Sequence, residues 1–178
     1  TGNGSTQSIT GVGFQPDFTW IKDRNDTGHH QLLDAVRGAT KYLSSNDNGV
    51  EATSSDGLTA FDSDGFSLGN NTNYNNSSRI YASWNWKANG QGSSNTDGSI
   101  NTTYTSVNTT AGFSISKYSG NTTAGATIGH GLGAVPKMIL IKNLTSSENW
   151  VVYHSSLGAT KFLSLNRSDA VSTSSGVF

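Results

Sequence analysis

Hydrophobic and polar residues alternate along this chain in short stretches, most clearly over residues 79–87. There, Ile80, Ala82, Trp84 and Trp86 occupy every second position, and the residues between them are mostly polar. A period of two residues is typical of a half-buried β-strand, whose side chains point alternately to its two faces. The pattern predicts a strand here. Because Trp84 and Trp86 share a face with Ile80, it also predicts that both indole rings are buried in a core.

Other short hydrophobic stretches predict further strands. The Asn-Gly, Asp-Gly and Ser-Gly pairs between them are typical of tight turns that join antiparallel strands. Short strands with frequent turns indicate an all-β fold, so we expect antiparallel β-sandwich or jelly-roll-like modules. The predicted strands cover residues 18–22, 31–36, 113–118, 138–142 and 151–156.

An internal repeat with a spacing of 120 residues organises the chain. The sequence GATKYLS at residues 38–44 recurs as GATKFLS at residues 158–164. Upstream of both, without any gap, the two prolines of the chain, Pro16 and Pro136, occupy equivalent positions. Chance is a poor explanation for so many ungapped matches. The sequence therefore predicts two tandem copies of one module with the same arrangement of strands.

The repeat also suggests where the modules begin and end. We expect a first module at residues 1–88, incomplete at its start, and a second module at residues 112–178, incomplete at its end. Residues 89–111, rich in Gly, Ser, Asn and Thr, are predicted to be a linker. The second copy stops before any counterpart of residues 61–86, so we expect either a fragment of a longer tandem array or two modules trimmed at both ends.

The composition narrows the class of protein. Hydrophobic residues make up 33% of the chain and charged residues 13%, both below the usual shares for a soluble domain. The chain has no cysteine, which excludes thiol catalysis, zinc–thiolate sites and disulfides. Nothing in the sequence calls for a cofactor. With so little apolar material, we expect stability to come partly from a homo-oligomer, either a trimer or a repeating filament.

The charge pattern excludes two kinds of partner. The net charge is -1, and Lys and Arg are not clustered anywhere. A nucleic-acid surface needs concentrated positive charge, so we expect no nucleic-acid partner. No apolar stretch approaches the length of a membrane helix, so we expect no membrane insertion.

Five motifs occur in a fixed order along the chain: TGNGS at 1–5, GFQPDFTWIK at 13–22, RGATKYLSSN at 37–46, FDSDGF at 61–66 and WNWKA at 84–88. Together they resemble repeat modules of unknown function in tail-fibre and other structural proteins of aquatic bacteriophages. The resemblance covers nearly the whole chain. It implies a β-rich module on a virion surface, in contact with other virion proteins and with a structural or host-adhesion role. It supplies no catalytic residues.

Two candidate binding sites follow from the side chains. Asp62 and Asp64 alternate before a glycine as carboxylates do in calcium-binding loops, although an Asp-Gly pair is also an ordinary turn. Tyr74, Tyr81 and Asn73 form the second candidate, for a host glycan or receptor. Aromatic rings stack on the C–H faces of sugars, and amide groups bond the hydroxyls.

Catalytic patterns are weaker. No nucleophile-elbow sequence presents a serine, and the adjacent His29 and His30 would point to opposite faces of a strand. We therefore expect a non-enzymatic virion structural or adhesion module, located extracellularly or on the virion surface. One alternative is a carbohydrate-binding module of a secreted bacterial protein. The other is a polysaccharide-degrading tailspike, whose carboxylate pair would come from Asp34, Asp56, Asp62 and Asp64.

Overall fold

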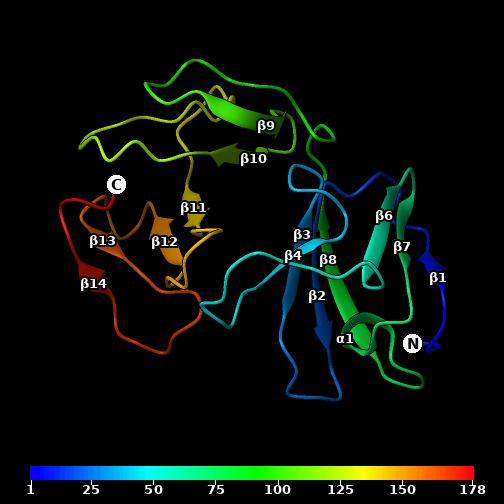
Figure 1. The fold of residues 1–178 in the computed structure, drawn as a ribbon. Helices are drawn as coiled ribbons and strands as arrows, with labels where there is room; N and C mark the ends of the chain where they lie inside the picture. The colour runs from blue at the N-terminus through cyan, green and yellow to red at the C-terminus, as the bar shows by residue number, and fades with distance from the viewer.

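The computed structural model describes residues 1–178, whose regular secondary structure is almost entirely antiparallel β-strands joined by turns and loops (Figure 1). The one helical segment is the single turn α1 (Thr72–Asn75), and the chain contains no helix able to cross a membrane. The predictions of an all-β fold and of antiparallel sheets are confirmed. The strands are β1 (Gln7–Ile9), β2 (Phe18–Asp23), β3 (Gln31–Asp34), β4 (Lys41–Ser44), β5 (Ala52–Thr53), β6 (Leu58–Asp62), β7 (Gly65–Leu68), β8 (Tyr81–Trp86), β9 (Thr102–Asn108), β10 (Phe113–Tyr118), β11 (Met138–Ile141), β12 (Val151–His154), β13 (Lys161–Phe162) and β14 (Ser172–Thr173).

The largest sheet has five strands in the order β5-β4-β3-β2-β8. β2 lies between β3 and β8 and pairs with both in antiparallel register. Thr19, Ile21 and Asp23 are buried on one face of β2, whereas Trp20 and Lys22 on the other face remain half-buried. The sheet therefore has an inner face, which carries Ile21, and an outer face, which carries Trp20.

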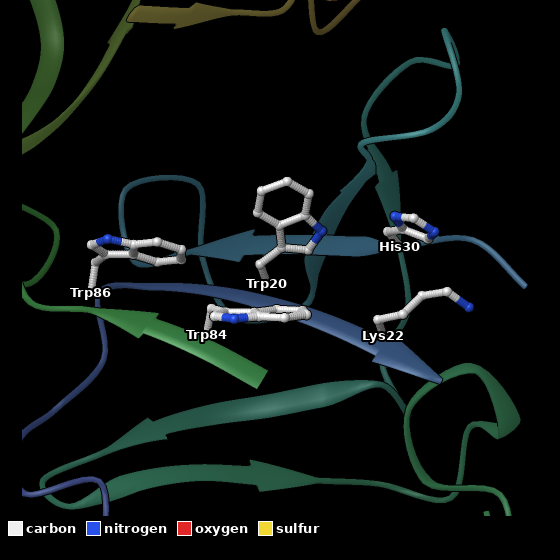
Figure 2. Close-up of a pocket in the computed structure, with 5 residues that line it drawn as sticks. All are labelled: Trp20, Lys22, His30, Trp84 and Trp86. Atoms are coloured by element: carbon white, nitrogen blue, oxygen red, sulfur yellow. The ribbon is translucent and has the colours of Figure 1, made fainter. Parts of the chain in front are cut away.

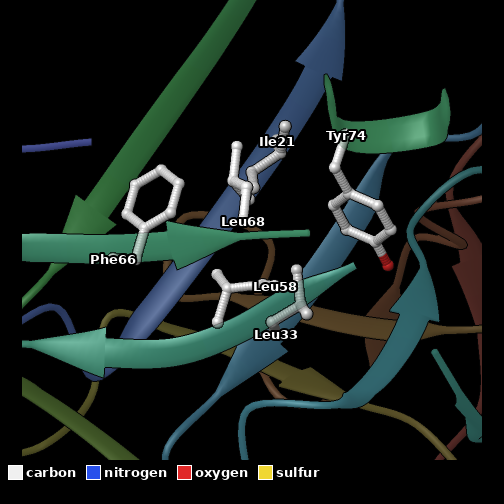
Figure 3. Packing of buried hydrophobic residues seen from close by; sticks show 6 residues of the cluster. All are labelled: Ile21, Leu33, Leu58, Phe66, Leu68 and Tyr74. Carbon is white, nitrogen blue, oxygen red and sulfur yellow. The ribbon is translucent and has the colours of Figure 1, made fainter. Parts of the chain in front are cut away.

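The main hydrophobic core lies between the inner face and a second sheet of three strands, β1-β7-β6 (Figure 3). Side chains from β2, β3, β6, β7 and α1 meet there and bury their apolar surface away from water. The residues are Ile21, Leu33, Leu58, Phe66, Leu68 and Tyr74.

A smaller cluster covers part of the outer face and joins the two halves of the chain. Trp150, which immediately precedes β12, packs against Leu32 of β3 and Leu43 of β4. Its indole Nε1 also donates a hydrogen bond to the carbonyl oxygen of Ser44, at 2.9 Å. A buried indole needs such an acceptor, so this contact fixes the C-terminal half against the larger sheet.

Residues 89–111, predicted to be a linker, contain the strand β9, which pairs with β10. Thr102, Thr105 and Ser106 of β9 are buried. Their hydroxyl groups are satisfied: Thr105 Oγ1 donates to Thr102 Oγ1 at 2.9 Å, and Ser106 Oγ accepts from the Asn89 amide at 2.8 Å. The composition resembles a linker, but threonine favours strands once its hydroxyl has a partner.

The C-terminal half contains two hairpins whose registers match those of the first half. Phe18 pairs with Asp34 across β2 and β3, and Met138 pairs with His154 across β11 and β12, each position shifted by 120 residues. Likewise, β13 pairs with β14 in the register of β4 with β5. The main difference is that β8 lies beside β2, whereas β11 pairs with β12 alone.

Candidate binding surface on a row of tryptophans

Three tryptophans lie side by side on the outer face of the five-stranded sheet, and we call Trp20, Trp84 and Trp86 the tryptophan row (Figure 2). Trp20 of β2 pairs with Trp84 of β8, so their side chains leave the sheet on the same face. Their ring centroids are 6.2 Å apart at an interplanar angle of 61°. Trp86 lies one pair further along β8, opposite Phe18.

Aromatic contacts hold one end of the row in place. The ring of Trp86 meets that of Phe18 edge to face, with centroids 5.4 Å apart. Phe113 of β10 stacks on Trp86 at 6.0 Å and an interplanar angle of 23°. Trp86 is thus oriented by two phenylalanines, a geometry that aromatic quadrupoles favour. The row is preorganised at this end before any ligand arrives.

The prediction that Trp84 and Trp86 are buried is wrong. Trp84 is 51% exposed and Trp86 is 37% exposed. The alternation along β8 does separate two faces, but the inner face carries Tyr81, which packs against the main core, and Asn85, which accepts a hydrogen bond from Thr19 Oγ1 at 3.1 Å. The tryptophans therefore point to the outer face, where Phe113 of β10 contacts Trp86 but half of Trp84 remains exposed.

The row lines a shallow pocket of about 230 Å³, which Lys22 and His30 complete at one end (Figure 2). Lys22 Nζ donates to the carbonyl oxygens of Asp23 and Asp26, both at 2.6 Å, which leaves one of its three N–H groups for a ligand. Burial, together with the nearby charges of Lys22 and His29, lowers the pKa of His30. His30 is therefore a neutral imidazole at pH 7, able to donate or accept a hydrogen bond.

This surface combines a broad apolar floor with few polar groups at its edge. Planar indoles offer π faces to the C–H groups of a sugar ring, and the ammonium and imidazole groups can bond its hydroxyls. The five residues that line the pocket do not include a nucleophilic side chain paired with a general base. The arrangement can hold a neutral, partly apolar ligand such as a glycan.

The predicted glycan residues do not form one site. Tyr74 is only 2% exposed and belongs to the main core, and burial raises the pKa of its phenol well above the ordinary value of 10.0. Tyr81 uses its hydroxyl to donate to Thr72 O and to accept from the Asn76 amide, both at 2.9 Å. Asn73 is exposed on α1. Tyr81 thus braces the α1 turn, and Tyr74 is inaccessible to a ligand.

The predicted metal residues have structural partners. Asp62 accepts a hydrogen bond from Ser67 Oγ at 2.7 Å. Asp64 accepts from the amides of Gly13 and Gly11, at 2.6 and 3.0 Å, and these bonds lower its pKa. No group of three or more His, Cys, Asp or Glu side chains comes together to hold a metal ion. Asp64 thus fastens the β6–β7 turn to the loop after β1, whereas Asp62 bonds within the β6–β7 hairpin.

The remaining carboxylates considered for catalysis are engaged separately. Asp34 is paired with Arg37, whose Nε lies 2.5 Å from its Oδ2. Asp56 accepts hydrogen bonds from Ser54 Oγ at 2.9 Å and from Asn71 Nδ2 at 3.2 Å, and these bonds lower its pKa. Each side chain is thus committed to its own loop or strand.

Sequence reasoning missed Trp20 and His30 as parts of a site, and it assigned Trp84 and Trp86 to the core. One signal was available. Trp84 and Trp86 occupy alternate positions of one strand, so they had to lie on the same face. Either face of such a strand can point to solvent, so the two rings could have been considered together as an exposed pair.

Comparison with known proteins gives one match. Residues 1–178 match a protein family described as Domain of unknown function (DUF7483). No curated protein and no solved structure matches the chain.

Proposed function

We propose that this chain, which belongs to the DUF7483 domain family, is a non-enzymatic adhesion module that binds glycans through its tryptophan row. The observation that carries the proposal is the exposure of Trp84, 51%, within a preorganised aromatic pocket. An indole left in water forgoes the stabilisation that burial would give it. A cluster of such side chains on one face is typical of a surface that meets a partner.

The polar partners in the pocket favour a carbohydrate over a purely apolar ligand. Lys22 retains a free N–H group, and His30 is a neutral imidazole that can bond a hydroxyl in either direction. Both lie at one end of the indole floor. A sugar ring presents this combination, with C–H groups on its faces and hydroxyls around its rim.

We place the module on a virion surface, as part of a phage fibre or a related structural protein. The low charged fraction and the sequence resemblance support this setting. The matching strand registers of the two halves support an organisation in tandem modules of β-sandwich type. Other virion proteins and further copies of the chain would then be its partners.

The distribution of carboxylates favours binding over hydrolysis. A glycosidase needs two carboxyl groups facing each other across the bound sugar. The pocket is lined by Trp20, Lys22, His30, Trp84 and Trp86, and none of these is acidic. This distribution supports an adhesin over a polysaccharide-degrading tailspike.

The test compares Trp84→Ala with Ile80→Ala, a matched control that removes another exposed apolar side chain close by in sequence. Binding to an array of bacterial surface polysaccharides is measured for both variants and the original chain. We expect Trp84→Ala to weaken binding at least about tenfold, or about 1.4 kcal/mol, and Ile80→Ala to leave it unchanged. Equal binding by all three proteins would refute the site. Release of reducing ends from a bound polysaccharide would refute the non-enzymatic role.

A further inference from the structure

The two halves of the chain share a backbone framework beyond their strands. The amide of Ala35 donates to Asp17 O at 2.9 Å, and the amide of Ser155 donates to Lys137 O at 2.8 Å, both positions shifted by 120 residues. The same shift relates the turn bonds from Lys41 to Gly38, at 3.0 Å, and from Lys161 to Gly158, at 3.2 Å. The way in which a strand edge or a sheet face is covered in one half therefore indicates how the corresponding edge or face of the other half can be covered.

One edge differs between the halves. β2 is paired with β8 from Phe18 to Asp23, whereas β11 has β12 on one edge and no strand on the other. No backbone hydrogen bond joins residues 138–141 to any segment except β12. The amide and carbonyl groups on the outer edge of β11 are thus without a protein partner.

The sequence of β11 is unsuited to an edge. All four residues, MILI, are apolar, and Met138 is 54% exposed. Natural edge strands are usually protected by charged residues, proline or a bulge, because open edges pair with other chains. A strand that is apolar at every position is typical of the interior of a sheet, with a neighbour on both edges.

The face that corresponds to the main core is also only partly closed. Tyr153 of β12 stands where Leu33 stands in β3, and its ring meets Phe178 at a centroid distance of 5.3 Å. Phe178 is at the position of Leu58, a residue of the main core. Ile139 and Ile141 on this face stay half-buried. In the first half, β7, α1 and the inner side of β8 complete the enclosure.

From these observations we propose that the open edge of β11 is a docking site for an antiparallel polypeptide strand with the sequence pattern of β8. The register follows from the first half, where Phe18 faces Trp86 and Trp20 faces Trp84. Met138 and Leu140 occupy the equivalent positions on β11 and face the two tryptophans of the incoming strand. Main-chain hydrogen bonds supply the affinity, and the alternating apolar side chains set the register.

The test appends a second copy of residues 59–88 directly after Phe178, because Phe178 already occupies the position of Leu58. Hydrogen exchange of the β11 amides, Met138–Ile141, is measured with and without the added segment. Tethering gives the strand an effective concentration in the millimolar range, so even weak docking becomes visible. We expect exchange at the outward-facing amides of β11 to slow at least about tenfold.

The matched control carries the same appended segment with prolines at the positions copied from Trp84 and Asn85. Adjacent prolines remove a ladder donor whichever way the strand faces, while length and tether stay the same. We expect this control to leave β11 exchange as fast as in the original chain. Equal protection by both segments, or protection by neither, overturns the proposal. Protection confined to β2, with β8 displaced, overturns it as well.

A measurement in trans guards against a fusion that misfolds. A synthetic peptide with the sequence of residues 79–88 is added to the unmodified chain, and the β11 amides are followed up to about 1 mM peptide. Slower exchange with the peptide, and not with a copy methylated at alternate backbone nitrogens, supports strand docking. No change at the highest concentration contradicts it.

Discussion

At the scale of single residues, the charge network of Asp34, Arg37 and Glu51 in the first half becomes His154, Leu157 and Val171 in the second. Arg37 Nε lies 2.5 Å from Asp34 Oδ2, and its NH1 lies 3.5 Å from Glu51 Oε2. The positions of Arg37 and Glu51, shifted by 120, carry Leu157 and Val171. Replacing a buried ion pair by apolar residues is often neutral in net stability, so one framework accepts either. In the second half, Leu157 is half-buried and Val171 is 44% exposed.

This difference between the halves predicts that a single substitution in the network destabilises the protein more than a double substitution that copies the second half. Arg37→Leu leaves the carboxylates of Asp34 and Glu51 without their shared cation and should lower the free energy of unfolding by about 3 kcal/mol. The double change Arg37→Leu with Glu51→Val, which copies the second half, should recover at least about 1 kcal/mol of that loss. Urea denaturation of the three proteins measures both effects. A double variant no more stable than Arg37→Leu would disprove this explanation.

At the scale of elements, α1 and β8 each do the opposite of what their sequences suggest. The polar turn α1 contributes a ring to the core, and the tryptophans of β8 are exposed. The polar stretch around Tyr74 forms one helical turn, and Asn71 caps it by accepting from the Asn73 amide at 2.9 Å. This turn directs the Tyr74 ring into the main core (Figure 3). β8, whose alternation predicts a core strand, turns its tryptophans outward because β6, β7 and α1 pack against its other face, which carries Tyr81.

The burial of Tyr74 and the exposure of Trp84 can be tested by measuring the free energy of unfolding. Tyr74→Ala should open a cavity in the main core and cost about 4 kcal/mol of unfolding free energy. Trp84→Ala removes a larger side chain but should cost only about 1 kcal/mol, because half of the indole is already in water. Chemical denaturation of both variants is the measurement. If Trp84→Ala proves the more damaging of the two, the assignment of inner and outer faces is wrong.

At the scale of the whole molecule, the chain exposes more surface than its size requires. Its accessible area is 9538 Å², whereas a monomer of 18.7 kDa is expected to expose roughly 8,300 Å². Only 28 of 178 residues are buried, and the apolar strand β11 has an open edge. Surface of this kind is stabilised when neighbouring modules or chains cover it.

We therefore predict that the protein acts as a homo-oligomer, a trimer or a filament. Light scattering should give a mass that is a multiple of 18.7 kDa, and the melting temperature should rise with protein concentration. Association removes apolar surface from water only in the assembled state, which is why concentration matters. A monomeric mass with a melting temperature independent of concentration would contradict the prediction.

The pattern of hydrophobic and polar residues predicted six of the fourteen strands: β2, β3, β8, β10, β11 and β12. The alternation in residues 79–87 predicted β8, and the repeat of 120 residues anticipated that Met138 and His154 would pair as Phe18 and Asp34 do. Hydrophobic periodicity and turn-forming residue pairs extend over only a few residues, so they can be recognised in a single sequence. The strand at residues 102–108 was missed because the composition of β9 resembles that of a linker. The other strands that were not predicted have no more than five residues each, too few for a clear periodic pattern.

Which face of each strand lies inside depends on tertiary packing. A period of two residues divides Trp84 from Asn85 but does not say which side meets another sheet. That depends on where β6, β7 and α1 pack, and on Trp150 reaching Ser44 from 106 positions away. The tryptophan row exists because these distant elements cover the inner face of β8 and leave its outer face in water.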